Sequence, residues 1–260
     1  WPVPEGDTYA KAAHRARNVL AGAVVTAVEG SAKAIRRHSP AILDRKVEAV
    51  RTVGKNLLID FDSGLTVRIH LGMNGTVQVT PPGRDRDLAG VRLGLRTDRG
   101  AVWAVGAPKV EVGKRAAIDG ALARLGPDLL ADEFDVRAFE ERAGRYPPDR
   151  PVCDFLLDQR VMAGVGNVYK SEVLFLERLA PDRTMATIDA ATRRRLAERA
   201  RRLMLPNTRR YNRSTRGLGD GSLWVYGRAG KPCRRCRTEI QEGWLGTPAR
   251  ITYWCPSCQQ

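Results

Sequence analysis

The amino-terminal half of the chain passes from one helical pattern of apolar residues to a series of strand-like patterns. Residues 8–20 predict a helix with an apolar face made of Ala10, Ala13, Ala16, Val19 and Leu20. Asp7 or Thr8 is placed to cap its first turn. Short β-branched runs then predict strands at residues 24–28, 47–53, 56–61, 66–70, 76–80 and 102–105. Strands at this density, separated by Gly and Pro, are typical of an antiparallel sandwich or barrel.

Helical spacing returns after the turn-forming run Leu-Gly-Pro-Asp at residues 125–128. The expected helices are residues 135–142, 151–159, 168–175 and 190–204. A polar, Arg-rich loop at 207–221 follows, and the last forty residues form a compact cysteine module. We therefore predict three domains, at residues 1–122, 123–222 and 223–260.

The charge of the chain indicates a polyanionic partner. Its 260 residues include 44 Lys and Arg against 29 Asp and Glu, a formal net charge of +15. Each phosphate that Lys or Arg neutralises releases counterions, so nucleic acid is favoured over the alternative of a merely Arg-rich composition. No apolar run approaches the roughly 18 residues of a membrane span, and residues 1–8 lack the pattern of a signal peptide. We expect a cytoplasmic protein without a membrane partner.

Four of the five cysteines form a metal-binding pattern. Cys233 and Cys236 make one CxxC pair, and Cys255 and Cys258 make a second after 18 intervening residues. Two such turns on a hairpin supply four thiolates in a tetrahedral shell, which suits one structural Zn²⁺ without an open position. Cys153 precedes an apolar run and is expected to be a buried, unreactive thiol.

Residues 159–172 predict two helices joined by a sharp turn that binds an anion. Gly164 and Gly166 permit the turn, Asn167 can cap the second helix, and Lys170 follows one turn later. The exposed amides at a helix start attract anions, so this turn is a candidate phosphate clamp. An ordinary helix connection within a core is the alternative.

The run Pro-Glu-Gly-Asp-Thr at residues 4–8 has two interpretations. A proline at a free amino terminus is a secondary amine that can attack a carbonyl-like carbon and form an iminium. Glu5 beside Pro4 could then move protons to and from the substrate. Taken alone, the run is more typical of a plain helix start.

Together these motifs resemble the formamidopyrimidine-DNA glycosylase/endonuclease VIII superfamily, in particular bacterial endonuclease VIII-like members of actinobacterial type. The resemblance covers residues 4–260 and includes residues 4–8, Val-Gly-Lys-Asn-Leu-Leu at 53–58, His-Leu-Gly-Met-Asn-Gly at 70–75, the turn at 164–172 and the four-cysteine finger. It implies an α+β fold: a helix and a two-sheet β-sandwich, a helical domain with a helix-two-turn-helix, and a β-hairpin zinc ribbon. It also implies a monomeric glycosylase and abasic-site lyase of base excision repair that acts on damaged double-stranded DNA.

The resemblance assigns the chemistry to the amino-terminal domain. Pro4 would attack C1′ of the damaged nucleoside and expel the base, and Glu5 would be the general acid and base. The resulting Schiff base permits β,δ-elimination of the strand. Lys55 would contact a phosphate next to the lesion.

The resemblance also implies a set of DNA-binding residues. Asn167 and Arg250 would hold the flanking phosphates. His70 of the 70–75 motif and Lys170 of the 164–172 motif are also expected to bind DNA. Met73 matches a side chain that fills the gap left by the flipped nucleotide. For Met73, packing in the core is the alternative.

Two departures from the family pattern bear on the function. Trp1, Pro2 and Val3 precede Pro4, so its nitrogen is an amide in the printed chain. We hypothesise that Val3 corresponds to a GTG start whose Met is removed; the alternative is a catalytically silent DNA-binding homologue. A zinc-ribbon module without catalytic ancestry is a third interpretation, but it does not account for the 53–58 and 164–172 motifs.

The second departure concerns the substrate. Residues 102–109 lack the Arg-Phe pair of purine-directed members, which favours oxidised pyrimidines as substrates.

Overall fold

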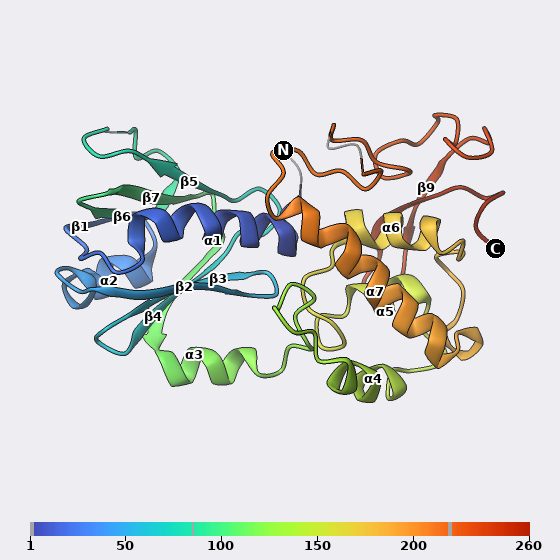
Figure 1. Cartoon of the computed structure of the whole chain (residues 1–260), viewed down its shortest axis with the longest axis horizontal. Coiled ribbons are helices and arrows are strands. Elements are labelled where there is room, and N and C mark those ends of the chain that lie inside the picture. The colour runs from blue at the N-terminus through green and yellow to red at the C-terminus, as the bar shows by residue number, and fades with distance from the viewer. Residues whose placement is uncertain (1–2, 85, 218–219) are drawn as a thin grey trace. The chain divides into compact units, whose positions relative to one another are not determined.

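The computed structural model describes residues 3–84, 86–217 and 220–260. The chain divides into two compact units, residues 1–124 and 125–260 (Figure 1). The first unit holds the amino-terminal motif and the 53–58 and 70–75 motifs. The second holds the helical turn and the cysteines. The further separation of the second unit into a helical domain and a finger stays a prediction.

The first unit contains three helices and two antiparallel sheets within its described residues. Its helices are α1 (Gly6–Leu20), α2 (Lys33–Ile42) and α3 (Arg115–Leu122). One sheet has the order β1-β6-β7-β5, from β1 (Ala27–Glu29), β6 (Val91–Thr97), β7 (Gly100–Val105) and β5 (Thr76–Thr80). The other has the order β2-β3-β4-β8, from β2 (Val47–Val53), β3 (Asn56–Phe61), β4 (Leu65–His70) and β8 (Lys109–Lys114).

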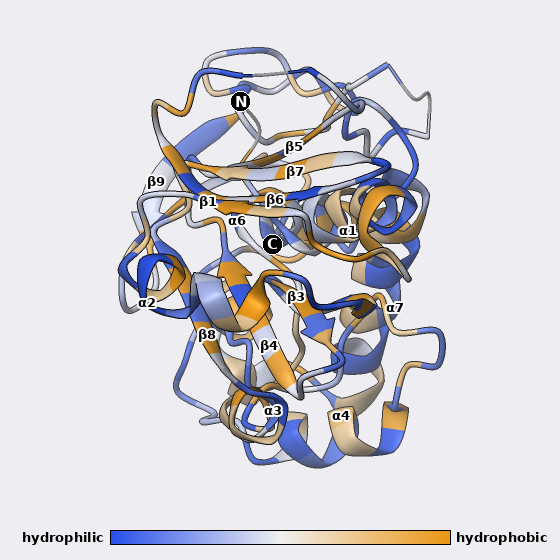
Figure 2. Cartoon of the chain, turned by 90° about the vertical axis from the view of Figure 1, so that its left-hand side faces the viewer, coloured by the Kyte–Doolittle hydropathy of each residue, from blue (hydrophilic) through white to orange (hydrophobic). Residues whose placement is uncertain are grey.

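The core of this unit lies between the two sheets and under α1. Leu57 and Ile59 of β3 share it with Leu95 of β6 and Val102 of β7. Figure 2 shows the apolar residues along β4, whose Val67 and Ile69 are fully buried. Because apolar side chains from both sheets face one core, the predicted two-sheet sandwich is confirmed.

Some local predictions for this unit need correction. The strand bounds 47–53, 56–61 and 76–80 agree with the structure, but β6 and β8 were not predicted. The region expected to be all β also contains α2, whose Ile35 and Ile42 are buried while its basic residues face solvent. The first helix begins at Gly6 with Glu5 as its N-cap, two residues before the predicted start.

The described part of the second unit consists of helices followed by a β-hairpin. The elements are α4 (Val136–Gly144), α5 (Val152–Leu157), α6 (Asn167–Leu176), η1 (Met185–Thr187), α7 (Ala190–Asn207), β9 (Gln241–Leu245) and β10 (Arg250–Trp254). Tyr169 and Val173 of α6 pack with Leu196 and Ala200 of α7. On another side of α6, Phe175 packs with Cys233 and Cys255. The cysteine module is thereby joined to the helices through α6.

Among the described residues, no helix has the length and apolar character that crossing a membrane requires.

Candidate functional site

The start of α1 presents Pro4 and Glu5 in a buried setting. Glu5 is the N-cap, with an extended backbone (φ −127°, ψ 179°), and its amide donates to Thr8 Oγ1 at 3.3 Å. Pro4 is buried, and Glu5 is fully buried although it carries a carboxyl group. A cap of this kind fixes the direction in which the chain enters the helix. The two candidate catalytic residues are therefore held at a defined point.

A pocket of about 140 Å³ brings Pro4 together with Met73. One wall is the first turns of α1, including Thr8 and Lys11, and the other is the loop between β4 and β5, including Leu71 and Met73. The Met73 side chain is 60 % exposed. Its exposure does not favour the core alternative and leaves the thioether available to another molecule.

The loop that carries Met73 is anchored at its base. The Leu71 amide donates to the Tyr9 hydroxyl oxygen at 2.7 Å, and the Gly75 amide donates to the Leu71 carbonyl at 2.8 Å. The Gly72 amide donates to His70 Nδ1 at 3.1 Å. Because these bonds fix both ends of a five-residue loop, Met73 is presented from a rigid support.

His70 lies among cations. Burial lowers its pKa below the ordinary value, and the nearby charges of Lys55, Arg68 and Lys109 lower the pKa further. Since Nδ1 accepts a hydrogen bond from Gly72, the neutral ring carries its proton on Nε2. His70 is therefore a neutral hydrogen-bond donor in a positively charged surrounding.

Lys55 reaches this cluster because of a two-residue turn between β2 and β3. Gly54 adopts a positive φ of 56°, which suits a hairpin turn, and Val53 pairs with Asn56 across it. The Nδ2 of the Asn56 side chain also donates to the Val53 carbonyl at 2.9 Å. The predicted catalytic and DNA-binding residues of this unit thus form two groups. Pro4, next to Glu5 in the chain, lines a pocket with Met73, and Lys55 lies near His70.

The predicted anion-binding turn is present, with a different cap. Gly164 has a φ of +113°, and Gly166, in an extended conformation, is the N-cap of α6. Asn167 is the first helical residue instead of the cap, so its side chain is not engaged in capping. The side chain of Asn167 is partly exposed and accepts a hydrogen bond from Lys170.

Lys170 corrects the expectation of a direct DNA contact. Its side chain is fully buried, and its Nζ donates to the Ile251 carbonyl at 2.9 Å and to Thr252 Oγ1 at 2.8 Å. A buried ammonium cannot meet a phosphate at the surface without leaving these acceptors. Arg250, at the start of β10, is exposed as a phosphate ligand must be.

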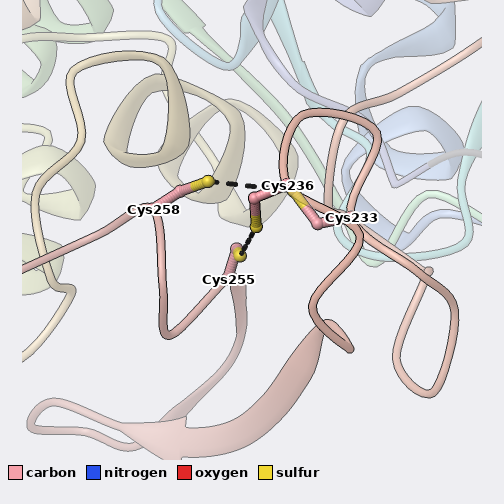
Figure 3. Close-up of side chains that lie close together, drawn as sticks. All are labelled: Cys233, Cys236, Cys255 and Cys258. Carbon is pink, nitrogen blue, oxygen red and sulfur yellow. Dashed lines mark hydrogen bonds between the residues drawn. The ribbon is translucent and has the colours of Figure 1, made fainter.

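The four cysteines converge from two turns. The Sγ atoms of Cys233 and Cys258 are 3.9 Å apart, those of Cys236 and Cys255 are 3.4 Å apart, and all four lie within 4.8 Å of one another (Figure 3). Four thiolates around one Zn²⁺ at about 2.3 Å would be about 3.8 Å apart. The residues therefore fit a tetrahedral metal site.

Comparisons with known proteins agree with this arrangement. The N-terminal domain of formamidopyrimidine-DNA glycosylase matches residues 3–107, and the H2TH domain of formamidopyrimidine-DNA glycosylase matches residues 125–216. A probable endonuclease 8 2 of Streptomyces coelicolor is 39% identical over 99% of this chain and 94% of its own length. The chain belongs to the formamidopyrimidine-DNA glycosylase/endonuclease VIII superfamily.

Within this superfamily, relatives named endonuclease 8 or Nei2 are 36% to 39% identical to this chain. A DNA-(apurinic or apyrimidinic site) lyase Nei2 of Mycolicibacterium smegmatis is 36% identical, covering 99% of both chains. A structure of the Lactococcus lactis Fpg with DNA containing an abasic site has a TM-score of 0.83 at 20% identity, covering 98% of this chain and 99% of that chain. The family predicted from the motifs and the α+β fold are confirmed.

Two buried residues with structural hydrogen bonds near the predicted site residues were not singled out from the sequence. Tyr9 supports the Met73 loop, and Glu172 is a fully buried carboxylate that accepts from the amides of Trp224, Val225 and Tyr226. Burial raises the Glu172 pKa. Glu172 stands in the predicted helical turn motif, but its acceptor role depends on residues 52 to 54 positions away.

Proposed function

We propose that this chain is a DNA glycosylase with abasic-site lyase activity that acts in base excision repair. One observation carries the proposal: in a member of this superfamily, Pro4 and Met73 line the same pocket, beside the buried Glu5. A nucleophile and a side chain that enters the DNA stack must both lie near a flipped nucleotide. The basic charge of the chain supports a DNA substrate.

The proposed reaction requires the secondary amine that Pro4 carries once the residues before it are absent. Its nitrogen attacks C1′ of the damaged nucleoside, the C1′–N bond to the base breaks, and the leaving base takes a proton. Glu5 supplies or accepts protons at the sugar as the ring opens to the iminium. Loss of a C2′ proton then expels the 3′ phosphate, a second elimination expels the 5′ phosphate, and water releases the sugar remnant from Pro4.

DNA binding is divided between the two units. Lys55 and His70 bind phosphate oxygens next to the lesion, the first as a cation and the second through its Nε2 proton. Asn167 and Arg250 bind flanking phosphates from the second unit. Such contacts position the strand and carry no sequence information, as repair at arbitrary positions requires.

The substrate class within this proposal is oxidised pyrimidines. The loop between β7 and β8, residues 106–108, packs beside the Met73 loop, with Pro108 against Gly72. It carries Gly, Ala and Pro and has no Arg or aromatic side chain to probe the opposing base. A duplex panel with thymine glycol and 8-oxoguanine tests this: preferred excision of 8-oxoguanine would exclude the pyrimidine assignment.

The cysteine cluster takes one structural zinc ion in this proposal. Cys233, Cys236, Cys255 and Cys258 would occupy all four positions of a tetrahedral ion, so the ion stabilises the hairpin that carries Arg250. We also propose that residues 123–222 and 223–260 are the helix-two-turn-helix domain and the zinc finger.

Borohydride trapping on DNA with an abasic site tests the proposed function. Two forms are compared, the printed chain and a form that starts with Met in place of Val3, so that removal of Met exposes Pro4. The expected result is a covalent adduct of the short form only, mapped to Pro4 by peptide mass. An adduct on a lysine, or no adduct with either form, would contradict the amine mechanism, and binding without an adduct would indicate a DNA-binding homologue.

A further inference from the structure

Lys170 is a buried cation with defined partners. Its side chain is fully buried on α6, and its Nζ donates to Asn167 Oδ1 at 3.3 Å, to the Ile251 carbonyl at 2.9 Å and to Thr252 Oγ1 at 2.8 Å. An ammonium has three donors and no acceptor. All three partners are oxygen atoms that can accept from an ammonium.

The contact with Asn167 determines which way its amide faces. An ammonium can only donate, so it selects the oxygen of the Asn167 amide and excludes the NH₂ group from the same position. The NH₂ group must then point away from Lys170. Because Asn167 begins α6 and is partly exposed, this orientation leaves its two N–H donors available to an anion at the helix start.

The other contacts hold the strand that begins with Arg250. Thr252 is fully buried, and its hydroxyl accepts from Lys170 and donates to the Arg250 carbonyl at 3.0 Å. The neighbouring Ser171 of α6 accepts from the Tyr253 amide at 3.3 Å. The backbone of β10 next to Arg250 is therefore fastened to α6 at the level of Asn167.

We propose that Lys170 is a positioning residue that couples the two phosphate ligands of this unit, Asn167 and Arg250. Lys170 orients the side-chain amide of Asn167 and fixes the strand that carries Arg250. Both residues can then bind the DNA backbone at the same time. This inference rests on the proposed DNA binding of Asn167 and Arg250, but not on the Pro4 chemistry.

The side-chain chemistry of lysine is required for this role. Methionine has a similar length and would fill the space, but it cannot donate to three oxygens and would leave Thr252 and Asn167 without this donor. The Asn167 amide could then rotate and present its oxygen to a phosphate, which is repulsive. We expect Lys170→Met to weaken DNA binding more than it perturbs the fold.

The test is a double-mutant cycle on the full chain. The variants are Lys170→Met, Asn167→Ala and the two together, with Lys33→Met, an exposed lysine of α2, as the control. The probe is a duplex with a tetrahydrofuran abasic analogue, and its dissociation constant is measured by fluorescence anisotropy alongside melting temperature and zinc content. We expect Lys170→Met to weaken binding roughly tenfold to hundredfold, with the double variant no weaker than Lys170→Met alone.

Additive effects of the two substitutions, or an unchanged dissociation constant for a folded, zinc-loaded Lys170→Met, would overturn the proposal. If the wild-type chain fails to bind the duplex, the proposed function fails instead. If the wild-type chain binds the duplex but gives no borohydride adduct, the Pro4 amine mechanism is rejected. The double-mutant cycle still tests the role of Lys170 in binding.

A second variant keeps the inference testable if Lys170→Met does not fold. Asn167→Asp places a carboxylate where Lys170 donates, so its melting temperature should exceed that of Asn167→Ala. Asn167→Asp should bind the same duplex more weakly than Asn167→Ala does, because the introduced carboxylate repels the DNA phosphate. An Asn167→Asp variant that is no more stable than Asn167→Ala would show that Lys170 does not face the Asn167 oxygen.

Discussion

The hydroxyl oxygen of Tyr9 accepts a hydrogen bond from the amide of Leu71 at 2.7 Å, and both residues are fully buried. Tyr9 lies one turn into α1, behind Pro4 and Glu5, and Leu71 begins the loop that carries Met73. This bond joins the candidate nucleophile and the candidate intercalating residue through the interior of the first unit.

The bond predicts a measurable effect of Tyr9→Phe. The substitution keeps the ring but leaves the buried Leu71 amide without this acceptor, which costs about 1–3 kcal/mol. We expect a lower melting temperature and slower base excision, with a smaller loss of cleavage at a ready-made abasic site. Tyr211→Phe, at a side chain that is 86 % exposed, is the control. Equal stability of Tyr9→Phe and the wild type would contradict the role of this bond.

Met73→Ala should slow base excision while leaving the melting temperature nearly unchanged. The side chain is 60 % exposed, so its truncation removes little buried area and should change the melting temperature only slightly. If Met73 fills the space of a flipped nucleotide, excision from duplex DNA should fall at least about tenfold. The measurement compares single-turnover excision from duplex and single-stranded substrates. A large loss of stability with unchanged excision would favour a packing role.

His70 should titrate below the ordinary histidine pKa of about 6.5, because burial and the charges of Lys55, Arg68 and Lys109 disfavour its protonated form. The unfolded chain then binds more protons than the folded chain as the pH falls. The stability contributed by neutral His70 is therefore present above about pH 6.5 and is lost as the pH falls through the lower, folded pKa.

NMR titration of the His70 ring checks this directly, and unfolding of His70→Asn across pH 5–8 checks its thermodynamic consequence. Asn does not titrate between pH 5 and 8, so this variant should have a flatter pH dependence of stability. Its side-chain oxygen can still accept from the Gly72 amide, which preserves that contact of the loop. A His70 midpoint above 6.5 in the DNA-free protein would contradict the assignment.

Cys236→Ser should release the proposed zinc ion and loosen the hairpin. Cys233 and Cys255 pack with Phe175 of α6, so the loss extends to this helix and should lower the melting temperature. Zinc content, melting temperature and affinity for abasic-analogue duplex are measured together. Cys153→Ser is a useful comparison, because Cys153 is buried outside the cluster and should not alter zinc content. Unchanged DNA affinity after zinc loss would exclude a role of the finger in binding.

Local patterns in the sequence determined the elements with strong periodicity and the chemistry carried by short motifs. The strands 47–53 and 56–61 were predictable because β-branched residues flank a Gly-Lys turn. The two CxxC pairs predicted the four sulfurs that meet in the structure, since each pair is a local turn. Helix α2 was missed because its ten residues include Pro40 and only two widely spaced buried isoleucines.

The tertiary structure decided which polar side chains face solvent and which are buried. Lys170 follows an anion-binding helix start and was expected at the surface, but β10, about 80 residues later, covers it and supplies its acceptors. The pairing of His70 with Lys109 across β4 and β8 places a third cation at His70 from 39 positions away. Burial and charge at a site depend on segments that meet only in the folded chain, and no local pattern contains that information.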